Sequence, residues 1–180
     1  EFDFEGKKCR IRKPTFQEKQ QVFEERVRLW TDLLKSGKFP LESELRKLYK
    51  TRGIDIDKME ADIKKLDTKR NDLNIKLGQS LKDKAPDKEC DVLKREIEEL
   101  LTTQTGIAAE KSNYLQYTLE TQVIIQIYTY LTSLVSETKN GEQWEKIYKD
   151  IEDFKSRNED ALTSRLIMYV SLFIRHELEI

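Results

Sequence analysis

The sequence predicts a mainly α protein, in which a short N-terminal β-hairpin and a helical base carry a long antiparallel coiled-coil hairpin arm. Two observations lead to this fold class. Apolar residues recur at heptad spacing between residues 55 and 122, and glycine (6) and proline (3) are too scarce in 180 residues for an all-β fold. We expect a β-hairpin and two helices over residues 1–54, the arm over 55–122, and C-terminal helices over 123–180 that complete the base.

The first helix of the arm begins near Asp55. Its seam positions are apolar except for one arginine: Ile56, Met59, Ile63, Leu66, Arg70, Leu73 and Leu77. The charged segment 82–89, which contains Pro86, then turns the chain. A second apolar series begins at Leu93 and predicts the returning helix.

Arg70 is the charged residue within this seam. It either fixes the register of the two helices through an acidic partner on the facing helix, or packs its stem while its charged end reaches solvent. Both alternatives remain open, and we treat Arg70 as the candidate register residue.

The first thirteen residues alternate in polarity. Phe2, Phe4, Cys9 and Ile11 share one face, and residues 5–7 supply a turn, which predicts a β-hairpin. A two-stranded hairpin is marginally stable alone. We therefore expect its phenylalanine face to pack on helices or on another subunit.

Two helices follow the hairpin. Thr15 and Glu18 have the spacing of a capping box, and Gly37 fits the end of the helix that they begin. Pro40 suits the start of a second, short helix that ends near Gly53. Asp57 and Glu60 form a second possible capping box, at the start of the arm.

Residues 123–135 are apolar on nearly all sides and predict a helix enclosed by neighbours. This helix could also continue the second helix of the arm. It is either a central core helix or an oligomer interface, and we favour the interface because the rest of the chain has little with which to cover it. Residues 140–141 end it, and apolar residues at helical spacing from Trp144 predict a further helix, followed by a last one from about residue 159.

Composition excludes several partner classes. The 33 basic and 34 acidic residues are interleaved and leave a net charge of -1, so no concentrated basic face for nucleic acid is expected. No stretch approaches 18 consecutive apolar residues, and no signal peptide is recognised at the start. We expect no membrane partner, a cytoplasmic location and two free thiols, with Cys9 in an apparent strand and Cys90 in the charged connection of the arm.

No catalytic or metal-binding pattern is found. His176 is the single histidine, and we interpret it as a solvated residue near a helix end, because a metal or nucleophilic site needs further converging groups. Residues 6–8 lack the spacing of a phosphate-binding loop. We therefore expect a protein that is no enzyme, with no cofactor, no metal and no small-molecule substrate.

Aromatic residues of the base are the candidate contact residues. Interface cores favour Tyr, Trp and Phe over Lys and Glu, so we rank the base above the charged segment 82–89. The candidate interface residues are Phe2, Phe4, Tyr128, Tyr130, Trp144 and Tyr169.

Residues 2–8 (FDFEGKK) followed by residues 11–16 (IRKPTF) resemble the opening of tailed-phage tail assembly chaperones. Downstream, Ser36-Gly37, Glu44-Leu45 and Arg52-Gly53 before a long helical segment are similar to small proteins encoded in large myophage genomes. The resemblance implies a helical, non-enzymatic virion-assembly factor or virion component that oligomerises, for example around the tape-measure protein. Its location would be the host cytoplasm or the virion.

Two function classes follow. The first is a phage assembly or structural protein that acts through oligomeric contacts. The second is a coiled-coil adaptor that binds a host or phage enzyme complex such as RNA polymerase.

Overall fold

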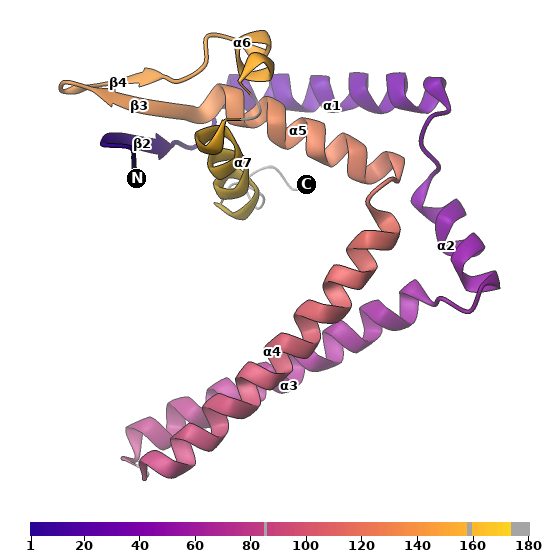
Figure 1. The fold of residues 1–180 in the computed structure, drawn as a ribbon, viewed down its shortest axis with the longest axis vertical. Helices are drawn as coiled ribbons and strands as arrows, with labels where there is room; N and C mark the ends of the chain where they lie inside the picture. Colours follow the sequence, from indigo (N-terminus) through magenta and orange to yellow (C-terminus); the bar gives the residue numbers. More distant parts are fainter. Residues whose placement is uncertain (85, 158–159, 174–180) are drawn as a thin grey trace. The chain divides into compact units, whose positions relative to one another are not determined.

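The structure is a computed structural model that describes residues 1–84, 86–157 and 160–173 (Figure 1). It is mainly helical, with a small antiparallel sheet. The elements are, in chain order, β1 (Phe2–Phe4), β2 (Lys7–Ile11), α1 (Phe16–Ser36), α2 (Glu42–Thr51), α3 (Ile56–Lys82), α4 (Asp87–Leu115), α5 (Leu119–Val135), β3 (Ser136–Asn140), β4 (Gln143–Lys146), α6 (Ile151–Ser156) and α7 (Ala161–Phe173). They pack into two compact units, which we call unit 1 (Glu1–Phe39 with Leu119–Ile180) and unit 2 (Pro40–Thr118).

The predicted N-terminal strand pair is confirmed. β1 and β2 are antiparallel, and Phe4 pairs with Lys7. The two residues between them, Glu5 and Gly6, both have positive φ angles (49° and 77°). Such a two-residue turn has the backbone twist that matches paired strands.

The hairpin is half of a larger sheet, with the strand order β1-β2-β3-β4. β3 pairs antiparallel with β2, so that Arg10 lies opposite Glu137, and β4 pairs with β3. The helix predicted from Trp144 is therefore wrong over residues 144–150, and helix α6 begins only at Ile151. The preceding helix also ends earlier than predicted, at Val135 instead of residues 140–141, because β3 takes residues 136–140 into the sheet. Asn140 pairs with Gln143 across a turn in which Gly141 takes a φ of 61°, and a glycine there allows a tight hairpin.

α1 begins and ends where the sequence predicts. The Thr15 hydroxyl accepts a hydrogen bond from the Glu18 amide (3.3 Å), and the Glu18 carboxylate accepts one from the Thr15 amide (2.9 Å). Gly37 ends the helix in the left-handed conformation, with a φ of 61°. Both devices satisfy backbone groups that helix ends leave without partners.

α5 is the central helix of unit 1 and packs against α1, α6 and α7 (Figure 1). A buried residue recurs at every fourth position: Leu119, Val123, Ile127, Leu131 and Val135. The rest of unit 1 thus covers most of the apolar surface of α5, and our premise that the chain lacks the means to cover it is wrong. α5 also does not continue α4, because residues 116–118 interrupt the helix.

A second group of core residues joins α6 and α7. Tyr148, Phe154 and Leu166 are buried together, and the rings of Tyr148 and Phe154 meet edge to face at 4.8 Å. The Tyr148 hydroxyl shares a buried hydrogen bond of 2.7 Å with the Thr163 hydroxyl. Phe2 packs against this cluster, which ties the sheet to the helices.

Unit 2 contains α2, α3 and α4, and α3 packs along α4 (Figure 1). α2 contacts α3 and belongs to this unit, whereas the sequence placed residues 40–54 in the base. Within unit 2, the Tyr49 and Tyr114 rings lie 5.1 Å apart. The buried Cys90 lies in the first turn of α4 and not in the connection between the helices.

The predicted capping box of Asp57 and Glu60 is wrong. Asp55 caps α3 by accepting a hydrogen bond from the Lys58 amide (3.0 Å). Asp57 and Glu60 instead accept hydrogen bonds from Arg46 of α2, and Glu60 also accepts one from Lys111 of α4. An acidic residue in a first helical turn can equally serve a neighbouring cation, and the tertiary contact prevails here.

Candidate protein-interaction site

α1 presents an apolar stripe to solvent along its whole length. The residues of this α1 stripe are 36–85% exposed: Phe16, Phe23, Val27, Trp30 and Leu34. A shallow hollow of about 270 Å³ lies on this stripe, lined by Phe23, Arg26, Val27, Trp30 and Thr31. Single exposed apolar residues are ordinary, but a contiguous stripe of large side chains usually marks a contact surface.

The stripe is separate from the face that holds α1 in unit 1. Val22 and Leu29 are the buried residues of α1, and α1 packs against α5. At 3.6 residues per turn, these buried positions lie about 120° around the helix from the stripe. α1 therefore has two apolar faces, of which unit 1 covers one.

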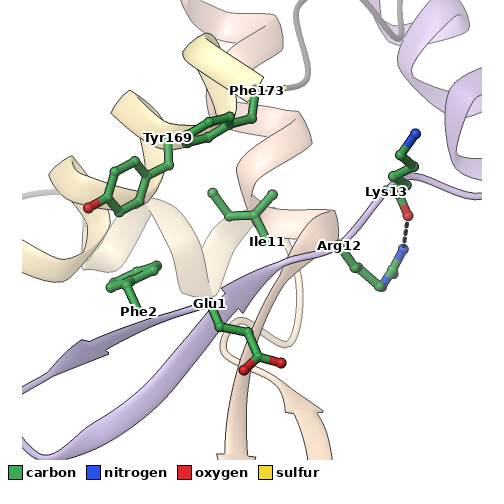
Figure 2. Close-up of a pocket in the computed structure, with 7 residues that line it drawn as sticks. All are labelled: Glu1, Phe2, Ile11, Arg12, Lys13, Tyr169 and Phe173. Carbon is green, nitrogen blue, oxygen red and sulfur yellow. Dashed lines mark hydrogen bonds between the residues drawn. The ribbon is translucent and has the colours of Figure 1, made fainter.

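A second concave feature lies between the strand pair and α7. It encloses about 450 Å³ and is lined by Glu1, Phe2, Ile11, Arg12, Lys13, Tyr169 and Phe173. Figure 2 shows the side chains of Phe2, Ile11, Tyr169 and Phe173 pointing toward one another. The rings of Phe2 and Tyr169 meet edge to face at 4.8 Å, and the guanidinium of Arg165 lies 5.6 Å from the centre of the Phe2 ring.

Ion pairs fix the start of α1 on the sheet. The Arg12 guanidinium donates to the carboxylates of Glu18 (2.6 Å and 2.7 Å) and Glu137 (2.9 Å), and Arg10 also pairs with Glu137 (2.6 Å). The hydrogen bond from Arg12 lowers the pKa of Glu18 to about 2, against the opposing effect of burial. The same bond raises the pKa of Arg12 above its ordinary value. These contacts orient α1, and with it the α1 stripe.

Two of the predicted interface residues contribute to the fold of unit 1. Phe2 packs against the core cluster around Tyr148. Tyr130 is half-buried, and its pKa is raised first by burial and then by the nearby carboxylates of Glu25 and Glu24 on α1. Tyr130 therefore lies close to α1.

The other four predicted interface residues are also half-buried: Phe4, Tyr128, Trp144 and Tyr169. Trp144 lies beneath the guanidinium of Arg10, which is 4.1 Å from the centre of the ring. Phe2 and Tyr169 meet at the pocket of Figure 2. The six residues do not form one site, and their role in partner binding stays a prediction.

Arg70 reaches the facing helix through a neutral partner. Its guanidinium donates to Gln104 of α4 (2.8 Å) and to Asp67 of its own helix (2.5 Å). The register alternative anticipated an acidic partner on the facing helix, but the partner there is the neutral side-chain amide of Gln104. The arginine side chain is 26% exposed, so its charge is also partly solvated.

The α1 stripe was not among the predicted interface residues, although the sequence contains a signal for it. All of its residues are visible as apolar positions of the helix that follows Thr15. On a helical wheel they separate from Val22 and Leu29. Which of the two faces meets α5 follows only from the tertiary structure.

Some predicted features lie outside the described residues, among them His176 and the remainder of the chain after Phe173. Within the described ranges, no group of three or more His, Cys, Asp and Glu side chains is arranged to hold a metal ion. None of the helices in the same ranges has both the length and the apolar content needed to cross a bilayer. Both cysteines are free and buried.

The chain was also compared with known proteins. Protein-family models, curated protein sequences and solved structures gave no match to it.

Proposed function

We propose that this chain is a non-enzymatic assembly protein that acts through protein–protein contacts, as its resemblance to tail assembly chaperones implies. The observation that carries the proposal is the α1 stripe, which a capping box and the Arg12 ion pairs hold in a defined orientation. A rigid helix that exposes large apolar side chains suits the recognition of another helix. An exposed apolar stripe lowers the solubility of a protein, and a partner that covers the stripe removes this effect.

The long helices of unit 2 supply the second part of the proposal. We infer that α3 and α4 form an antiparallel coiled coil whose register Arg70 and Gln104 define. Buried Leu73 and the packing of α3 along α4 support this arrangement. A polar pair within an apolar seam favours one register, because any slip leaves its hydrogen-bonding groups without partners.

An alternative function is a coiled-coil adaptor for a host or phage enzyme complex such as RNA polymerase. It is favoured by exposed apolar residues near the connection of α3 and α4, namely Ile75, Leu81 and Val92. In that case the end of the helix pair, and not α1, would contact the partner.

Affinity capture tests the proposal. A tagged chain is expressed in the cells that naturally make it, captured partners are identified by mass spectrometry, and each complex is rebuilt from purified components. We expect Val27→Gln to weaken the rebuilt complex and Ile125→Gln to leave it unchanged. Val27 and Ile125 are 52% and 49% exposed, so the two substitutions remove similar apolar surface from different helices.

The adaptor alternative predicts the opposite pattern, with Leu81→Gln weakening the rebuilt complex while Val27→Gln has no effect. If no rebuilt complex forms, the assembly function is contradicted.

A further inference from the structure

The α1 stripe has the spacing of a two-helix seam. Together with Gln20, which lies on the same face, the stripe residues are separated alternately by four and three positions: Phe16, Gln20, Phe23, Val27, Trp30 and Leu34. This is the a/d spacing of a coiled coil, with Gln20, Val27 and Leu34 on one series and the three aromatic residues on the other. The seam starts at the first residue of α1 and nearly reaches its end, Ser36. The geometry therefore suits a helix of matching length and pattern.

We propose that the α1 stripe binds the α1 stripe of a second copy of this chain, with the two helices parallel and in register. This inference rests on the proposed function and deepens it, because it names the protein that covers the α1 stripe, a second copy of the same chain.

Gln20 is the first observation in favour of a second copy. It is the one polar residue among the six seam positions. A side-chain amide both donates and accepts hydrogen bonds, so two glutamines at the same level can pair with each other. In the single chain the Gln20 amide donates to Glu24 in a contact of 3.2 Å on the exposed surface. A parallel register aligns Gln20 with its own equivalent, as buried amides do in two-stranded coiled coils.

The charges beside the seam are the second observation. Lys19 and Arg26 occupy one flank, and Glu24 occupies the other. In a parallel pair each flank meets the opposite flank of the partner, so Lys19 of one copy lies near Glu24 of the other. An antiparallel pair instead brings like flanks together, Arg26 against Arg26 and Glu24 against Glu24. Charge complementarity thus selects both a second copy and the parallel orientation.

The exposed area is sufficient for a weak dimer. Aromatic side chains each present roughly 150–250 Å², so the partly exposed stripe leaves on the order of 500 Å² of apolar surface per copy. Two copies together bury about 1,000 Å², which is near the lower limit for a specific interface. We therefore expect a dimer with a dissociation constant on the order of micromolar.

Sedimentation equilibrium of the full chain tests whether a second copy binds the α1 stripe. The unmodified chain should reach the dimer mass with rising concentration. Val27→Gln should raise the dissociation constant by about tenfold or more, while Ile125→Gln should leave it unchanged. A chain that is monomeric throughout, or an assembly that Val27→Gln does not weaken, overturns the inference. Neither result contradicts the assembly function if the rebuilt complex with another protein forms.

Cysteine crosslinking tests the orientation. In a parallel, in-register pair the two copies of residue 34 approach within disulfide distance, about 6 Å between Cα atoms. In an antiparallel pair they lie near opposite ends of a helix of 21 residues, about 30 Å apart. Oxidation of Leu34→Cys should therefore yield a covalent dimer. Lys35→Cys, exposed beside the stripe, is the control and should yield little; a dimer in which only Lys35→Cys crosslinks overturns the proposed register.

Discussion

Arg12 and Glu18 form a two-pronged ion pair in which both terminal nitrogens of the guanidinium donate to the carboxylate, at 2.7 Å and 2.6 Å. The same carboxylate completes the capping box of α1. The Glu18 side chain therefore joins Arg12, at the end of the β-hairpin, to the start of the helix that carries the α1 stripe. Charge-assisted bonds of this geometry are among the stronger polar contacts in proteins.

The pH dependence of unfolding should report this pair. The pKa of Glu18 is about 2 in the fold, against an ordinary value of 4.5, so the unfolded chain binds more protons between these values. The stability that Glu18 contributes is fully present above pH 4.5 and is lost as the pH falls toward 2, up to about 3 kcal/mol. Urea unfolding from pH 2 to 7 should show a smaller loss in Glu18→Gln than in the unmodified chain; the lowered pKa values of Glu60 and Asp153 contribute to the loss in both. Glu142→Gln, which removes an exposed charge, should retain the loss.

Two buried serines should respond differently to the same substitution. The Ser136 hydroxyl has no hydrogen-bond partner among the described residues, whereas the Ser133 hydroxyl donates to the Tyr130 carbonyl at 2.7 Å. Ser136→Ala removes a polar group that is buried at a cost, so we expect unchanged or higher stability, by about 1 kcal/mol. Ser133→Ala should lower stability by about 1 kcal/mol. Thermal unfolding measures the stability of both variants. A larger loss of stability for Ser136→Ala than for Ser133→Ala would show that the Ser136 hydroxyl has a hydrogen-bond partner.

Arg46 should matter more than Arg28, although each pairs with acidic residues. Arg46 is 23% exposed and binds Glu42, Asp57 and Glu60 across two helices, while Arg28 is 60% exposed and pairs within α1. We expect Arg46→Met to destabilise unit 2 by about 1–2 kcal/mol and Arg28→Met by less than about 0.5 kcal/mol. Faster hydrogen exchange confined to the amides of α2 would locate the effect. Equal responses would show that the Arg46 contacts are weak.

The coiled coil proposed for α3 and α4 can be tested at Leu73, which is 7% exposed. Leu73→Asp places a charge without a partner between the helices and should destabilise unit 2 by about 3–5 kcal/mol. The control is Leu101→Asp, at a position of α4 that is 47% exposed. Circular dichroism during heating should show early loss of helix for the first variant alone. Coincident unfolding curves would rule out a buried seam at Leu73.

Three local signals in the sequence predicted their elements correctly. The capping box at Thr15 and Glu18, the stop at Gly37 and the strand pair around Gly6 all depend on residues within a few positions of one another. Such contacts need no distant partner, although the capping box predicted at Asp57 and Glu60 shows that a distant cation can prevail over a local contact. Local sequence was thus enough to place both ends of α1, and helical periodicity was enough to identify a mainly helical chain.

Contacts between distant residues decided the rest. β3 exists because its backbone pairs with β2, more than a hundred positions earlier in the chain. β4 then pairs with β3, and this pairing overrode the helical spacing that begins at Trp144. α5 became a core helix because α1 and α7 cover it. Which apolar face of α1 is buried depends on packing in unit 1: α1 packs against α5, Val22 and Leu29 are buried, and the α1 stripe stays exposed. Periodicity identifies a face that can be buried, but the burial itself requires a partner surface that folding brings from elsewhere in the chain.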